Sequence, residues 1–131
     1  MSKKLLVFVS AICVLTAAVP LIAHHSFAAE FDASKPVTLT GTVTKVEWSN
    51  PHVWFYTDVK DETGKVANYG FEMGSPNGLM RAGWTRNSMK AGDEVTVDGF
   101  KARSGRPLGN ATSVVLTSSG QKLFAASSQG Q

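Results

Sequence analysis

Residues 37–48 read VTLTGTVTKVEW, and this stretch decides the fold that the sequence predicts. Apolar residues alternate with polar ones, which is typical of a β-strand with one buried face. The apolar parity changes within the segment: the first set comprises Val37, Leu39, Gly41 and Val43, and the second comprises Val46 and Trp48. A one-residue shift beside Gly41 predicts a bulge or a sharp coil in one long strand.

The chain that follows reads as further short strands around one helix. We expect strands at residues 53–60, 65–73, 94–102 and 110–117, with a helical segment at 75–82. Residues 61–64 read DETG, which is typical of a hairpin turn. Ser75 followed by Pro76 is typical of an N-cap and the first helical position, and Gly83 is expected to end the segment.

This order of elements predicts an all-β domain with a small helical contribution. Five strands with a helix between the third and the fourth is the arrangement of the OB-fold, a small β-barrel. A long coiled first strand suits this fold, because that strand serves both sides of the barrel. A six- or seven-stranded sandwich is the alternative. The expected core residues are Val43, Val53, Phe55, Phe71, Val95, Val97 and Val115.

The N-terminal residues have the three-part layout of a secretory signal peptide. Lys3 and Lys4 precede an apolar run at residues 5–19, and a small residue, Ala23, offers a cleavage position. The run is shorter than the roughly 20 apolar residues that a membrane-spanning helix needs. Cleavage after Ala28 is the alternative. We therefore expect a signal peptide at 1–23, an N-terminal arm at 24–36, an OB-like domain at 37–118 and a flexible tail at 119–131.

Composition narrows the classes of function. The chain has 13 Lys and Arg against 10 Asp and Glu, and two of the lysines belong to the predicted signal peptide. The remainder is nearly neutral, so no nucleic-acid partner is expected. The one cysteine, Cys13, also lies in the signal peptide, which excludes a disulfide or a thiolate site in the mature protein. A periplasmic or secreted location is expected, with no stable membrane span after cleavage.

The three histidines of the chain, His24, His25 and His52, form the candidate site. Cleavage after Ala23 would give His24 a free α-amine, which can chelate a metal ion together with its imidazole. His25 and His52 would add nitrogen donors if the arm folds back. Nitrogen-rich ligand sets suit Cu(II), so copper is the expected cofactor. The alternative interpretation is a solvated polar segment and a histidine that caps a turn.

Two other groups of side chains have weaker functional interpretations. Surface aromatics of OB-folds stack on bases or sugars, but aromatics also fill gaps around a small barrel. The group here is Trp48, Trp54, Tyr56 and Trp84. A loose basic set is a candidate anion-binding group, although scattered charges usually lie on a solvated surface. It comprises Arg81, Arg86, Lys101, Arg103 and Arg106. No catalytic constellation is evident, so we do not expect an enzyme.

The chain resembles a family of small exported bacterial proteins with a domain of unknown function. Two motifs carry the resemblance, His24-His25-Ser26-Phe27 and Asn50-Pro51-His52. Further matching segments are Phe31-Asp32, Gly41-Thr42-Val43, Glu72 with Ser75-Pro76, Gly83-Trp84-Thr85-Arg86 and Gly92-Asp93-Glu94-Val95-Thr96-Val97. The resemblance implies an exported single domain and links the three histidines as one set, without implying an activity.

The sequence thus predicts a periplasmic metal-binding or accessory protein with a possible protein partner. The alternative, from another class, is a non-metal binding module for a protein or a small ligand. The first requires His24, His25 and His52 to converge. The second predicts an exposed apolar or aromatic patch with the histidines apart.

Overall fold

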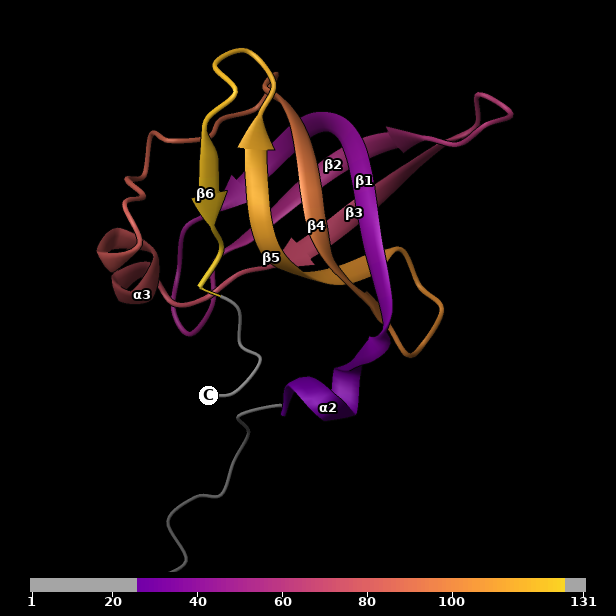
Figure 1. The fold of residues 1–131 in the computed structure, drawn as a ribbon, viewed down its shortest axis with the longest axis horizontal. Coiled ribbons are helices and arrows are strands. Elements are labelled where there is room, and N and C mark those ends of the chain that lie inside the picture. The colour runs from indigo at the N-terminus through magenta and orange to yellow at the C-terminus, as the bar shows by residue number, and fades with distance from the viewer. Residues whose placement is uncertain (1–25, 127–131) are drawn as a thin grey trace, which may run out of the picture.

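The computed structural model describes residues 26–126 (Figure 1). Its elements are α2 (Phe27–Glu30), β1 (Phe31–Glu47), β2 (Trp54–Lys60), β3 (Val66–Glu72), α3 (Pro76–Arg81), β4 (Glu94–Ala102), β5 (Leu108–Leu116) and β6 (Lys122–Phe124). Strands dominate, which confirms the predicted all-β class. Within the described residues, no helix has the length and apolar character needed to cross a membrane.

The six strands form one sheet that closes into a ring. Their order is β3-β2-β1-β4-β5-β6, and each neighbouring pair is antiparallel. A parallel pairing of β3 with β5 joins Gly70, Phe71 and Glu72 to Leu108, Gly109 and Asn110. This contact closes the ring through β3, β2, β1, β4 and β5, and β6 extends the sheet from β5 (Figure 1).

Strand β1 serves both sides of the ring, as its sequence predicts. Its first part pairs with β4 up to Thr42, and its last part pairs with β2 from Gly41 onward. The register shifts between Val43 and Lys45, which confirms the predicted bulge. Gly41 has no room for a side chain, because a Cβ there would lie 2.5 Å from the carbonyl oxygen of Asp58.

The start of β1 differs from the prediction. The strand begins at Phe31 rather than at Val37, so the residues expected to belong to an arm are already paired with β4. Pro36 lies inside the strand, opposite Phe100, beside a register shift. A proline is tolerated here because β2 pairs with β1 only further along, which leaves this part of β1 with one neighbour in the sheet.

The core lies inside the ring and agrees with the prediction at every expected position except Val115. Six expected residues are at most 1% exposed: Val43, Val53, Phe55, Phe71, Val95 and Val97. Val115 is only partly buried, and Val114 is fully buried in its place. The register between β4 and β5 shifts at Thr112, so the inward-facing positions change parity from Ala111 to Val114.

Helix α3 has the caps that the sequence predicts. The Ser75 hydroxyl accepts a hydrogen bond from the backbone N–H of Gly78 at 3.1 Å, and Pro76 occupies the first helical position. Gly83 follows the helix with a φ of +96°, a conformation that favours glycine. Leu79 is fully buried, so this short helix contributes to the core between β3 and β4.

The expected flexible tail contains a strand, β6, which corrects the prediction for residues 122–124. Gly120, with a φ of +68°, allows a tight return from β5, and its N–H donates to the carbonyl of Leu116. Leu123 is 6% exposed and Ala125 is fully buried. The segment has one buried leucine among Ser, Gly and Gln, and one residue gives no apolar periodicity. The strand was therefore not predicted, and the composition indicated a flexible tail.

Candidate functional site

His52 lies in the turn between β1 and β2, directly before the start of β2. The turn contains a cis peptide bond between Asn50 and Pro51. Two backbone hydrogen bonds hold its exit to the end of β3: Val53 N–H donates to Gly74 at 3.0 Å, and Met73 N–H donates to Val53 at 2.8 Å. The backbone that carries His52 is therefore fixed to the closed end of the sheet.

The His52 imidazole contacts a carboxylate that the sequence did not predict as its partner. Its Nδ1 lies 3.1 Å from Oε1 of Glu72, the last residue of β3. The two side chains are 17% and 8% exposed, so the pair is largely removed from water. A carboxylate beside Nδ1 orients the ring and favours the tautomer in which Nε2 carries the lone pair. The arrangement leaves Nε2 as the ring nitrogen of His52 with the lone pair.

The burial of Glu72 was not predicted, because the alternation of apolar and polar residues in this strand assigns its side chain to the solvent-facing side. The expected inward face of this strand contains Phe71 and Met73, which assigns Glu72 to an outer face. In the structure the end of β3 is flanked by β2 on one side and by β5 on the other. The Glu72 side chain is buried at this closure, and the sequence signal for it was its place, with Ser75-Pro76, among the segments that carry the family resemblance.

The remaining predicted ligands, His24 and His25, lie outside the described residues. Between residues 26 and 126 no group of three or more His, Cys, Asp or Glu side chains converges into a metal site. Met73 and Met89, whose thioethers are weak donors, are buried in the core. The described part of the chain therefore supplies His52 and its carboxylate partner.

A cavity of about 410 Å³ opens beside the start of β2. Three parts of the chain surround it: α2 together with the start of β1, the first residue of β2, and the turn from β4 to β5. Its lining comprises Ala29, Glu30, Phe31, Trp54, Ala102, Arg103, Ser104, Arg106 and Leu108. Trp54 is two residues from His52, so the cavity and the His52 turn belong to the same end of the molecule.

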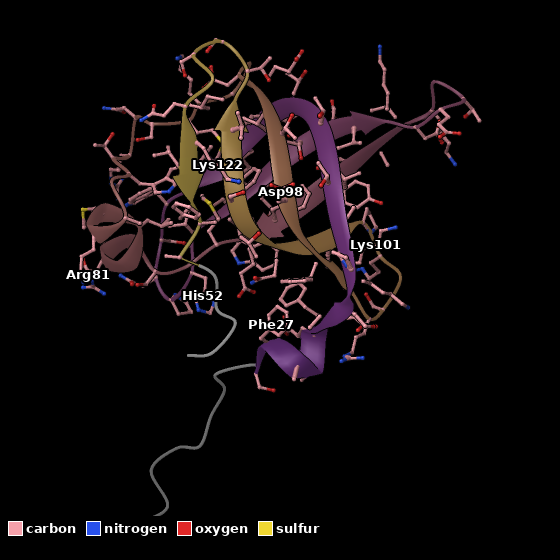
Figure 2. All side chains as sticks on the ribbon, in the orientation of Figure 1. Phe27, His52, Arg81, Asp98, Lys101 and Lys122 are labelled. Carbon is pink, nitrogen blue, oxygen red and sulfur yellow. The ribbon has the colours of Figure 1, made fainter. Side chains whose placement is uncertain are left out.

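Aromatic contacts hold α2 against this end. The Phe27 ring lies 5.7 Å from the ring of Phe31 and 5.6 Å from the ring of Phe100, with an edge-on arrangement to the latter. Figure 2 shows His52 between Arg81 on α3 and Phe27 on α2 in this view. Helix α2 is thus packed against the start of β1 and against β4.

Arg103 ties α2 to the β4–β5 turn. Its Nε donates to the carbonyl of Ala28 at 2.8 Å, and its guanidinium lies 3.7 Å from the carboxylate of Asp32. Hydrogen bonds from Ser34 lower the pKa of Asp32, which keeps this carboxylate ionised, and Arg103 adds to the effect. Arg106, by contrast, makes no ion pair with any of residues 26–126.

The aromatic residues considered from the sequence fall into different environments. Trp84 is 2% exposed, and its Nε1–H donates to the carbonyl of Phe124 at 2.9 Å. Trp48 packs against the core, and the Tyr56 hydroxyl lies 3.3 Å from the carboxylate of Glu47. Of this group only Trp54 borders the cavity. The four aromatics do not form one stacking surface.

Comparison with known proteins places the chain in a family. No curated protein sequence matches it. Residues 11–111 match the sequence profile of a family of unknown function, DUF6152, and this match covers most of the chain. The chain therefore belongs to the DUF6152 family of unknown function.

Proposed function

We propose that this protein is an exported, non-enzymatic metal-binding protein that holds Cu(II) through His24 and His52. The α-amine and imidazole of His24 chelate the ion, His52 contributes an imidazole nitrogen, and His25 is a further donor. The observation that carries the proposal is the contact between His52 and Glu72 at 3.1 Å. Metal-ligating histidines commonly present their second ring nitrogen to a carboxylate in this way.

The position of α2 supports the convergence of the histidines. Ala29 and Glu30 of α2 line the same cavity as Trp54, so α2 and the start of β2 are neighbours. His24 is three residues before Phe27, and an extended chain spans at most about 10 Å over this length. The imidazole side chain adds to that reach. In the proposed site, this short connection links His24 to α2.

We further propose that the closed sheet is an OB-fold-like barrel of five strands. The support is the ring β3-β2-β1-β4-β5 with α3 between β3 and β4, and β6 as an added strand. Barrels of this class place their ligands at strand ends and connecting loops. The His52 turn is the β1–β2 connection, which is one of these positions.

Export is a requirement of the metal site, because only cleavage after Ala23 creates the His24 amine. The charged start, the apolar run and the small residue at 23 support this cleavage. Intact mass of the protein recovered from the periplasm of an expressing bacterium is expected to correspond to residues 24–131. A mature chain that begins at Ala29 would lack two of the three ligands and would contradict the proposal.

Calorimetric titration of the processed protein with Cu(II) tests the site itself. We expect one ion per chain, weaker binding after His52→Ala, and weaker binding when an extra residue precedes His24. Affinity should fall as the pH drops, because the amine and the imidazoles must be deprotonated to bind the metal. Equal weak binding by all forms would show that the histidines are surface polar residues. It would favour the alternative function, a non-metal binding module for a protein or a small ligand.

Two carboxylate variants separate a metal site from a purely structural ion pair. Glu72→Gln removes the charge beside His52 and should weaken Cu(II) binding by about 10–100-fold. Glu62→Gln removes the same charge in the β2–β3 turn, at the other end of β2, and should leave binding unchanged. Urea unfolding of each variant in the absence of metal identifies losses of affinity that come from unfolding.

A further inference from the structure

We propose that the cavity between α2, the start of β2 and the β4–β5 turn binds a small organic anion with a planar apolar body. At about 410 Å³ it lies within the range of small-molecule sites, roughly 300–1,000 Å³. It combines apolar and aromatic walls with a few charged groups, which is the usual composition of such sites. The inference is separate from the metal site and does not require it.

The apolar part of the cavity favours a flat ligand. Phe31 is 2% exposed and is held by the ring of Phe27, so this wall is rigid. Trp54 is half-buried at the first position of β2, which leaves part of its side chain accessible at the cavity. A planar apolar group gains contact area against such side chains at little conformational cost.

The charged part favours an anion. The lining contains two guanidinium groups, Arg103 and Arg106, and one carboxylate, Glu30, and Arg103 is also paired with Asp32 outside the lining. Arg103 is held by Asp32 and by the carbonyl of Ala28, which fixes its position. Arg106 has no ion-pair partner among the described residues, which leaves its planar fork of N–H donors available to a carboxylate.

The size of the cavity and its charge argue for one anionic group on a compact molecule. A nucleic-acid strand would need a row of cations, whereas this cavity offers one unpaired guanidinium beside an anchored one. An aromatic ring system with a free carboxylate matches both the apolar part of the cavity and its charged part. The ligand class is therefore an aromatic carboxylate.

Titration with 2-naphthoate in the presence of EDTA tests this assignment. In ¹H–¹⁵N spectra of the processed protein, the indole N–H of Trp54 should shift, together with backbone signals of the β4–β5 turn. Naphthalene-2-methanol, the neutral analogue, should bind more weakly by about tenfold, the value of one charge-assisted hydrogen bond. Decanoate, a carboxylate with a flexible chain, should also bind more weakly than 2-naphthoate.

Arginine variants locate the binding. Arg106→Ala should weaken 2-naphthoate binding by about tenfold, and Arg106→Lys should give an intermediate loss because it keeps the charge but not the fork. Arg81→Ala, which removes an exposed arginine of α3 outside the cavity, is the matched control and should leave binding within about twofold. Equal binding to wild type and Arg106→Ala would overturn the site, and equal binding of decanoate would overturn the planar ligand.

Discussion

Phe55 and Phe71 form the centre of the core at the residue scale. They are direct partners across β2 and β3, both are fully buried, and their ring centroids lie 5.3 Å apart in a stacked arrangement. Gly109 of β5 packs against Phe71, because a Cβ at that position would lie 3.0 Å from the ring. The stack therefore supports the β3–β5 closure beside which Glu72 and His52 lie.

Replacement of Phe55 by alanine is expected to lower the free energy of unfolding by about 3–5 kcal/mol, since it removes a buried ring and leaves a cavity. Urea unfolding measures this loss. Phe124, whose side chain is 66% exposed, offers the matched control, and Phe124→Ala should change stability by less than about 1 kcal/mol. Similar losses for both variants would show that the assignment of the core is wrong.

At the scale of elements, the β2–β3 hairpin is stabilised by its own turn. The carboxylate of Asp61 accepts hydrogen bonds from the hydroxyl of Thr63 at 2.6 Å, from its N–H at 2.8 Å and from the N–H of Lys65 at 3.0 Å. Gly64 completes the turn with a φ of +85°. The hydrogen bond from the Thr63 hydroxyl is the main cause that lowers the pKa of Asp61 below its ordinary value of 3.8.

This lowered pKa predicts a pH-dependent contribution to stability. A carboxyl group whose pKa is lower in the folded state stabilises the fold above its unfolded-state value, and the contribution is lost as the pH falls through the folded-state pKa. Asp61→Ala should therefore lower Tm at neutral pH, and the difference from wild type should narrow below pH 3.8. Thermal unfolding across this pH range measures the effect, with Glu62→Ala as the control. A difference in Tm between Asp61→Ala and wild type that stayed constant with pH would contradict this account.

Much of the element order was predictable because local patterns determine it. The alternation in residues 37–48, the DETG turn and the Ser75-Pro76 cap predict a long strand, a hairpin and a helix, and the structure has all three. Two boundaries were not predictable in this way. Pro36 suggested a break, but pairing with β4 extends β1 back to Phe31, and β6 has one buried leucine without periodicity.

The candidate site was less accessible from sequence than the fold. His52 was identified because it is one of three histidines that would form a nitrogen-rich ligand set, but its partner Glu72 becomes buried only through the β3–β5 closure. The same holds for Arg106 and Trp54, which are far apart in the chain and meet at one cavity. Such contacts depend on the three-dimensional closure of the sheet, and no local pattern contains them.

At the scale of the whole molecule, the proposed chemistry gathers at one end of the ring. Helix α2, the first residue of β2 and the β4–β5 turn line one cavity there, whereas the β2–β3 hairpin extends away from the body (Figure 1). In the proposed site, processing of the N-terminus determines whether the His24 amine is available to bind the ion. Export, folding and metal binding are thereby connected in the proposed function.

The environment of bound Cu(II) tests this connection most directly. Electron spin-echo envelope modulation of the processed protein with one equivalent of Cu(II) counts the imidazoles that bind the ion through one ring nitrogen. We predict that the imidazole of His52 contributes to the wild-type spectrum and that His52→Ala, shown by urea unfolding to be folded, lacks this contribution. Identical spectra for the two proteins would show that His52 does not bind the metal and would contradict the proposed site.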